Sequence, residues 1–142
     1  MLQEKISAAL RAFIKAMNEA ALALGLKRSH FGVAHGMNHY DNYSSALDIA
    51  NLTKVALRTH PTLFDIVNTK NYEIGSKINP GHIYKWENTN RLLWETNGRG
   101  GKSPFFGVKT GNTTWAGPCL CANYKEQGYD FIIVVLNCKN PQ

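Results

Sequence analysis

The N-terminal part of the chain has apolar residues at helical spacing. Over the first 24 residues they recur every third or fourth position: Ile6, Leu10, Phe13, Ile14, Met17, Ala21 and Leu24. Gly25 then supplies a stop signal. The pattern predicts a helix from about Glu4 to Leu24, with its apolar stripe packed in a core.

Two more helices are predicted after a connection rich in His, Asn and Gly that covers residues 26–43. Ser44 is a suitable N-cap for the second helix, which reaches about Thr59. Asp48 lies in its first turn, where a carboxylate favours the helix dipole. Pro61 can open a short third helix that carries Leu63–Val67.

Beyond Asn68 the apolar period changes from that of helices to that of strands. Gly, Pro and Asn separate five predicted strands, at residues 72–75, 83–87, 105–109, 115–122 and 131–137. The last contains the apolar run Phe131–Leu136, which predicts a central strand buried on both faces. Residues 127–130 form the hairpin turn before it. Helices followed by antiparallel strands predict an α+β fold, with the N-terminal helices packed on the sheet.

Composition narrows the class of protein. The 142 residues suit one domain, and the apolar share of 44% with 18% charged residues is that of a globular protein. The net charge of +6 would attract anionic partners, but the basic residues form no run of five, so nucleic acid is not expected. No apolar run approaches the roughly 20 residues of a membrane span, and Gln3, Glu4 and Lys5 do not fit a signal peptide.

Neither the cysteines nor the histidines predict a metal or a cofactor. Three cysteines cannot form a complete disulfide framework, and the strand spacing of Cys119 and Cys121 suggests small buried hydrophobes. His35 and His39 have the i, i+4 spacing of zinc ligands on a helix. Gly36 lies between them, however, and the Glu of an H-E-x-x-H motif is absent.

The best candidate for chemistry is the stretch from Phe105 to Gly117. Lys109 and Thr110 place an ammonium and a hydroxyl donor together at a predicted strand end, which suits a carboxylate ligand. Gly111 has no Cβ, so a ligand backbone could lie close to the strand there. The nearby loop at residues 97–103 is not a phosphate-binding loop, because Thr96 stands where the first Gly is required.

The order of motifs resembles the D-alanyl-D-alanine carboxypeptidases, which are low-molecular-mass penicillin-binding proteins of the serine β-lactamase-like superfamily. The resemblance runs from about Phe13 to Leu136. Six sequence motifs carry the resemblance: Phe13–Asn18 with Leu24–Leu26, His30–Phe31, His35–Met37, Tyr43–Asp48, Asn88–Leu93, and Gly107–Thr113 with Ala116–Gly117.

This resemblance implies acyl transfer by a serine nucleophile outside the cytoplasm, although nothing in the sequence exports the chain. The family needs an S-x-x-K motif, an S-x-N motif and a K-T-G strand as the third wall of the site. It implies that Lys109 and Thr110 engage the carboxylate of a terminal D-Ala or of a β-lactam. The backbone just past Gly111 would lie by the oxyanion site, and Thr113 would support it.

The sequence departs from the family at the two other motifs. No serine is followed by Lys at the third place, and S-x-N is absent. Tyr40–Asn42 mimics the Y-x-N variant of related β-lactamases, but it falls in a loop that the family places after its second motif. We therefore assign no catalytic residue. Residues 1–142 are interpreted as a single, incomplete domain, the C-terminal part of the family's catalytic domain, and inactive alone.

Three functional interpretations stay open. The first is that the chain contributes the K-T-G half of a serine carboxypeptidase site, its other half being lost, outside this sequence, or supplied by another polypeptide. It could be a non-catalytic structural or interaction subunit. A third interpretation is a basic module for an anionic polymer such as peptidoglycan or nucleic acid. Without the family's second helical layer the strand at 131–136 would be exposed, so we expect a second polypeptide, another copy or a large assembly to cover it.

Overall fold

The computed structural model describes residues 7–138, and in this range it confirms an α+β fold. Three helices come first: α1 (Ala8–Ala23), α2 (Ala46–Thr59) and α3 (Pro61–Asn68). The antiparallel hairpin of β1 (Asn71–Gly75) and β2 (Ile83–Glu87) follows, then two short 3-10 helices, η1 (Arg91–Trp94) and η2 (Arg99–Gly101). A three-stranded sheet closes the chain: β3 (Phe105–Thr113), β4 (Gly117–Glu126) and β5 (Tyr129–Val135).

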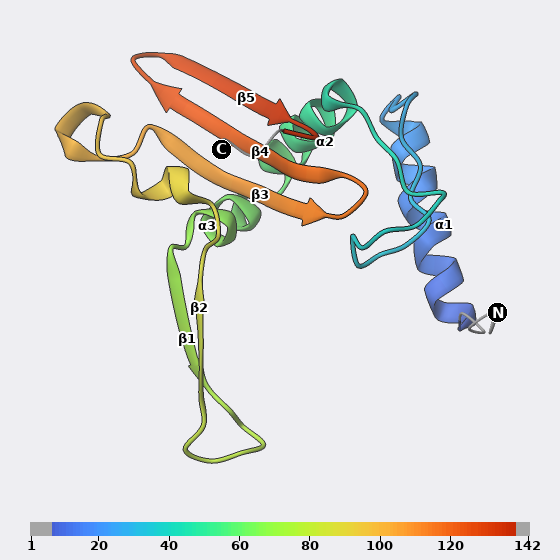
Figure 1. Cartoon of the computed structure of the whole chain (residues 1–142), viewed down its shortest axis with the longest axis horizontal. Helices are drawn as coiled ribbons and strands as arrows, with labels where there is room; N and C mark the ends of the chain where they lie inside the picture. The colour runs from blue at the N-terminus through green and yellow to red at the C-terminus, as the bar shows by residue number, and fades with distance from the viewer. Residues whose placement is uncertain (1–6, 139–142) are drawn as a thin grey trace.

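Helix α1 lies to the side of the three-stranded sheet (Figure 1). Ser7 caps its first turn by accepting a hydrogen bond from the Leu10 amide, while the predicted start at Glu4 falls outside the described residues. The predicted core packing of its apolar stripe is wrong for Leu10, Phe13 and Leu24, which are exposed, whereas Ile14 and Met17 are half-buried and Ala21 is buried. Asn18 instead anchors α1, because its side-chain amide exchanges two 2.8 Å hydrogen bonds with the backbone of Phe31.

Helix α2 begins one residue later than predicted. Ser45, not Ser44, is the N-cap, and its hydroxyl accepts a hydrogen bond from the Asp48 amide at 3.2 Å. The buried Asp48 carboxylate accepts hydrogen bonds from the Arg28 amide at 2.7 Å and the Ser29 hydroxyl at 2.8 Å. Asp48 therefore joins α2 to the preceding segment, which periodicity alone could not reveal.

Helices α2 and α3 cover one face of the sheet, whose strand order is β3-β4-β5 (Figure 1). The Thr53 hydroxyl of α2 lies 3.3 Å from the Cys121 thiol of β4. Phe64 of α3 packs on Phe106 of β3, with ring centroids 5.3 Å apart. In Figure 1 these helices lie behind the sheet, and no described helix crosses the side nearer the viewer.

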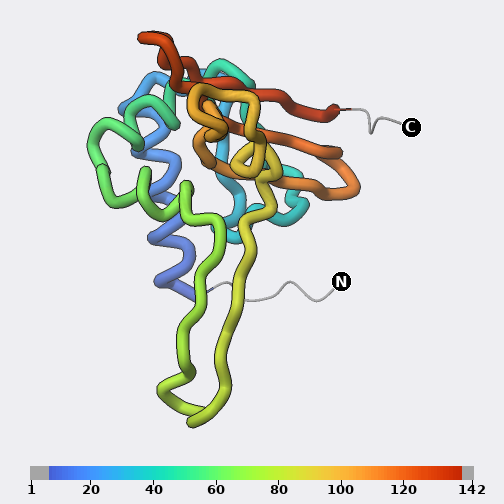
Figure 2. The backbone as a smooth tube through the Cα atoms, turned by 90° about the vertical axis from the view of Figure 1, so that its left-hand side faces the viewer, coloured from blue at the N-terminus to red at the C-terminus, as the bar shows by residue number. Residues whose placement is uncertain are grey.

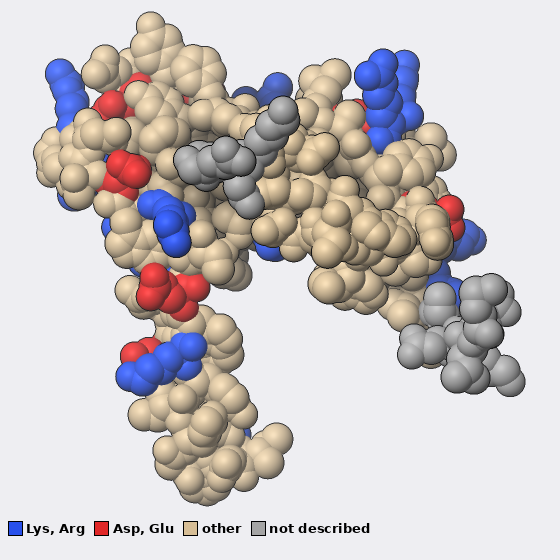
Figure 3. Space-filling view, viewed as in Figure 1, with Lys and Arg blue, Asp and Glu red and all other residues tan. Residues whose placement is uncertain are grey.

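The predicted central strand is instead an edge strand. β5 pairs with β4 only, and its alternate side chains Phe131, Ile133 and Val135 are 51%, 38% and 42% exposed. An apolar run shows that both faces suit burial, but it does not encode the neighbours of a strand. Over this face the visible surface in Figure 3 is largely neither basic nor acidic.

The accessible surface is large for the length of the chain. It amounts to 11232 Å², whereas a folded monomer of this mass exposes about 7,300 Å² by the usual scaling. No large side chain among the described residues is fully buried. The β1–β2 hairpin contributes to this excess, because all of its paired residues are exposed and it projects away from the rest of the molecule (Figures 1 and 2).

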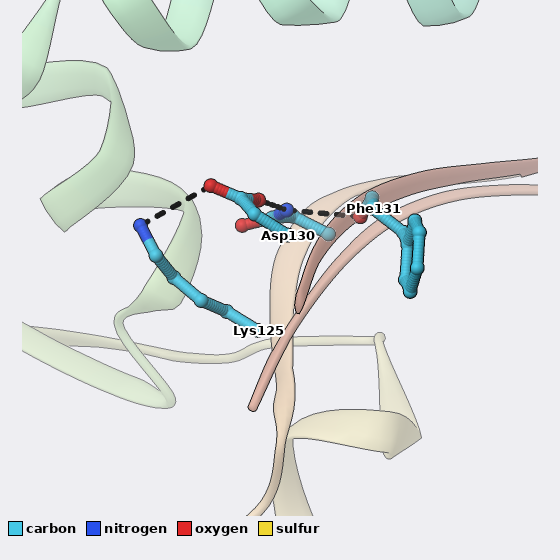
Figure 4. Close-up of polar contacts among 4 residues, drawn as sticks. Lys125, Asp130 and Phe131 are labelled. Carbon is cyan, nitrogen blue, oxygen red and sulfur yellow. Dashed lines mark hydrogen bonds and ion pairs between the residues drawn. The ribbon is translucent and has the colours of Figure 1, made fainter. Parts of the chain in front are cut away.

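A polar cluster stabilises the β4–β5 hairpin near its turn. The buried side-chain amide of Asn123 donates hydrogen bonds to the Asp130 carboxylate at 2.7 Å and to the Phe131 carbonyl at 2.9 Å (Figure 4). Lys125 forms an ion pair with the other Asp130 oxygen at 3.3 Å. The Asn123 hydrogen bond, helped by Lys125 and Arg58, holds the pKa of Asp130 below its usual value. The turn itself consists of Gln127 and Gly128, both with positive φ.

Candidate functional site

The K-T-G residues lie inside β3, not at its end as predicted. The strand continues to Thr113 because Thr110 pairs with Leu120 and Thr113 pairs with Gly117. The turn that follows is closed by Gly117, which has a positive φ, and by Thr113, whose hydroxyl accepts the Ala116 amide at 3.1 Å. Hairpin pairing thus extends the strand through residues whose polarity had suggested a loop.

The side chains alternate along this part of β3. Lys109, Gly111 and Thr113 share one face, while Thr110 lies on the other. The exposed Lys109 ammonium donates to the Thr110 carbonyl, and the Thr110 hydroxyl lies 2.6 Å from the Thr89 hydroxyl. Thr89 follows β2, and nothing in the sequence pattern had linked it to the candidate site.

Two glycines of β3 have opposite surroundings. At Gly107 a Cβ would collide with the Val67 carbonyl of α3, and the Gly107 amide donates to the Asn68 side chain at 2.8 Å. At Gly111 no atom lies within 4 Å of the position that a Cβ would take. The close approach of the strand to α3 therefore requires Gly107, whereas a side chain at Gly111 would meet open space.

A cavity of about 270 Å³ lies beside Gly111–Thr113. One wall is the loop at residues 36–42, which lies far from β3 in the sequence. Asn38 donates to the Thr114 hydroxyl at 2.9 Å, and Tyr40 packs on Trp115 with ring centroids 5.2 Å apart. No periodic signal connects two loops so distant in the chain, so only the folded structure shows this contact.

The three histidines of this region bond to backbone groups of their own loop. The Nδ1 atoms of His35 and His39 accept hydrogen bonds from amides two residues ahead, and His30 Nδ1 lies 2.6 Å from the Asp41 carbonyl. Within residues 7–138 no three His, Cys, Asp or Glu side chains are grouped so that they could hold a metal ion. In the Y-x-N look-alike, Tyr40 is exposed and Asn42 lines the cavity.

The cysteines differ in their surroundings. Cys121 is buried, and burial raises the pKa of its thiol against the opposing effect of the hydrogen bond with Thr53. A raised pKa reduces the thiolate fraction and hence the reactivity. Cys119 is half-buried and lines the cavity beside Gly111, so the prediction of small buried hydrophobes fits Cys121 better than Cys119.

The serine hydroxyls have structural partners in caps, turns and loops. Ser7 and Ser45 cap helices, and Ser76 accepts the Asn79 amide at 2.9 Å in the β1–β2 turn. The Ser29 hydroxyl donates to the Asp48 carboxylate at 2.8 Å and lies 2.7 Å from the Ser44 hydroxyl. The Ser103 hydroxyl donates to the Leu92 carbonyl at 2.5 Å. These contacts connect the serine hydroxyls to the local backbone and to Asp48.

Known proteins place the chain in a family. The family model described as D-alanyl-D-alanine carboxypeptidase matches residues 1–140. The chain belongs to the D-alanyl-D-alanine carboxypeptidase family. The resemblance inferred from its motifs is therefore confirmed. The D-alanyl-D-alanine carboxypeptidase DacA of Escherichia coli is 32% identical over 88% of this chain.

Solved structures of related proteins agree with this family and with the fold. A mutant of the Streptomyces K15 DD-transpeptidase superposes with a TM-score of 0.78 at 31% identity over 95% of this chain. Penicillin-binding protein D2 of Listeria monocytogenes, in a cefotaxime-bound form, gives 0.68 at 28% identity over 88%. The chain spans only 28% of the length of DacA and 51% of that of the transpeptidase. None of the described helices has the length and apolar character of a membrane span.

Proposed function

We propose that this chain provides the carboxylate-binding strand of a D-alanyl-D-alanine carboxypeptidase site and is catalytically incompetent alone. The observation that carries the proposal is Lys109-Thr110-Gly111 on β3, an edge strand with open space at Gly111. An extended peptide can add to such an edge through backbone hydrogen bonds. Its terminal carboxylate, lying at this strand edge, would be within reach of the Lys109 ammonium from one face of the sheet and of the Thr110 hydroxyl from the other, as would the carboxylate of a β-lactam. Thr113 keeps the hairpin turn in place.

The nucleophile and its base come, in this proposal, from residues that this sequence does not contain. Two facts support it: the sequence has neither S-x-x-K nor S-x-N, and it spans about half of the related transpeptidase. Residues 1–142 then form one incomplete domain. Those missing residues belong to another polypeptide or to a longer form of this one.

A second polypeptide would also cover the open face of the sheet. Phe131, Ile133 and Val135 form an apolar surface there, and β5 has an unpaired edge beside it. A soluble monomer rarely leaves such a surface in water. The same surface supports the alternative that the chain is a non-catalytic structural subunit of a larger assembly.

The test combines covalent labelling by a fluorescent penicillin with NMR titration of a peptide ending in D-Ala-D-Ala. We expect the isolated chain to remain unlabelled and to bind the peptide reversibly, with shifts at residues 109–113. Lys109→Ala should weaken binding about tenfold, because it removes a charge-assisted hydrogen bond. Lys102→Ala, an exposed lysine outside β3, is the matched control and should leave the affinity unchanged.

The outcomes separate the alternatives. Covalent labelling of the isolated chain would refute catalytic incompetence. Labelling that requires an added polypeptide would support a divided site. If the peptide does not bind and the chain is never labelled within its native complex, the structural-subunit alternative replaces the proposal.

A further inference from the structure

The β1–β2 hairpin has a row of aromatic side chains along one face. Cross-strand pairing of Tyr72 with Trp86, and of Ile74 with Tyr84, puts these four residues on the same face. The ring centroids of Tyr84 and Trp86 are 5.6 Å apart with planes 17° apart, and those of Tyr72 and Trp86 are 6.1 Å and 28° apart. We call Tyr72, Tyr84 and Trp86 the aromatic row.

The aromatic row is open to solvent. Its three members are 53%, 45% and 53% exposed in the order Tyr72, Tyr84, Trp86. Cross-strand contact between Tyr72 and Trp86 helps to stabilise the hairpin. That contact does not account for Tyr84, which extends the row along β2 opposite an isoleucine. The hairpin that carries the row projects away from the rest of the molecule (Figure 2), and about half of each side chain is open to a ligand.

The dimensions suit a small ligand better than a protein. A stable protein interface uses about 20–30 residues on each side, whereas the row has three rings on a hairpin two strands wide. A cavity of about 520 Å³ lies where the hairpin meets α3, within the roughly 300–1,000 Å³ of small-molecule sites. Tyr72 and Trp86 line it together with Lys70, Glu87 and Ile66.

The charge of the hairpin does not favour a polyanion. Residues 71–87 contain two lysines and two glutamates, so their sum is zero although the whole chain carries +6. Lys85 and Glu73 pair at 2.8 Å, on the face opposite the aromatic row. A nucleic-acid strand would need stacking rings together with a basic groove, and this hairpin supplies only the rings.

We propose that the aromatic row and the adjoining cavity bind a neutral saccharide chain. A pyranose ring has flat faces of C–H groups that can lie on aromatic rings, and hydroxyls around its edge that need hydrogen-bond partners. Tyr72, Tyr84 and Trp86 supply the ring faces. At the base of the row, the Glu87 carboxylate accepts hydroxyl hydrogen bonds and the Lys70 ammonium donates to them.

The experiment measures binding of cellohexaose and chitohexaose to the full chain by calorimetry and by amide chemical shifts. We expect saturable binding of at least one of them, with shifts confined to the hairpin and the Lys70 region. Trp86→Ala and Tyr84→Ala should each weaken it about five- to tenfold, because each removes one ring face. Trp86→Phe should retain most of the affinity. The matched control is Ile78→Ala, which removes a 97% exposed apolar side chain from the same hairpin.

Four results would overturn the proposal: binding of neither oligosaccharide, full affinity in both ring-deletion variants, tighter binding of heparin than of both neutral chains, or undiminished affinity in Trp86→Leu. The last would show that apolar area, not a ring face, is what matters. All of these substitutions are at exposed positions, and circular dichroism verifies their folding. Lys109→Ala should leave saccharide binding unchanged, so failure of the carboxypeptidase proposal is distinguishable from failure of this one.

Discussion

The two faces of the β3–β4–β5 sheet are made from alternate residues of the same strands, yet helices α2 and α3 cover only one of them. On the covered face, α2 and α3 bring Thr53 against Cys121 and Phe64 against Phe106. On the open face, Phe131, Ile133 and Val135 are partly exposed to solvent. The run Phe131–Leu136 is apolar at every position, so the difference lies in the cover and not in the strand.

The covered face and the open face should therefore contribute to different properties: the covered face to the stability of the isolated chain, and the open face to association with a partner. The covered face owes its structure to residues within the chain, and buried polar groups such as Asp48 and Asn123 fix the surrounding segments. The open face has apolar side chains without a second layer, which a sheet apolar on both sides requires. Substitutions on the covered face should therefore change unfolding of the isolated chain, and those on the open face should change association.

The largest effect is expected at Asp48, which anchors the covering helix α2. Asp48→Ala would leave the Arg28 amide and the Ser29 hydroxyl without their acceptor. Loss of two such hydrogen bonds to a buried charge should lower the free energy of unfolding by about 2–4 kcal/mol. Urea denaturation monitored by circular dichroism measures it. Asp65→Ala, at an exposed acidic position of α3, should cost less than about 0.5 kcal/mol; equal effects would show that Asp48 does not anchor α2.

A matched pair of valines compares the two faces directly. Val134 pairs with Cys121 and faces the helices, while its neighbour Val135 lies on the open face. We expect Val134→Ala to lower the free energy of unfolding by about 1–2 kcal/mol and Val135→Ala by less than about 0.5 kcal/mol. Denaturation of the isolated chain provides this measurement.

The order should reverse for association. Val135→Ser should reduce self-association or capture of a partner in analytical ultracentrifugation, and Val134→Ala should not. If the two valine-to-alanine variants destabilise the isolated chain equally, then the open face is covered within the chain itself, and the comparison between the faces fails.

The sequence predicted most elements because they depend on local periodicity. The helices, the two hairpins and the α+β class followed from apolar spacing and from Gly and Pro positions. The position of β5 at the edge did not, because pairing order depends on which strands are present and not on the apolar run itself. The end of β3 was placed at Lys109 because polar residues follow, yet pairing with residues 117–120 extends it to Thr113.

The part of the candidate site that is local in sequence could be predicted, and the part that is distant in the chain could not. Lys109, Thr110 and Gly111 are adjacent in sequence, so a short motif identifies them, and their role in binding stays a prediction. The groups that surround them are distant in the chain. Thr89 reaches Thr110 from the end of β2, and Asn38 reaches Thr114 from the first long loop. Such contacts arise only when the chain folds, and no local pattern encodes them.

The smallest expected effect concerns Asp130, at the margin of the covered face. Its pKa lies below the ordinary 3.8, chiefly because Asn123 donates to the carboxylate, with Lys125 and Arg58 contributing. The folded state therefore binds the proton less readily than the unfolded state. The stabilisation that the Asp130 carboxylate contributes is complete above the unfolded pKa and is lost as the pH falls through the folded pKa.

The Asp130 carboxylate is largely exposed, so solvent screening keeps the effect small. We expect Asp130→Asn to reduce the difference in urea midpoint between pH 7 and a pH below 3.8, the ordinary pKa of the carboxyl group. Asp65→Asn should keep the full difference. An unchanged pH dependence in Asp130→Asn would show that this cluster does not stabilise the β4–β5 hairpin.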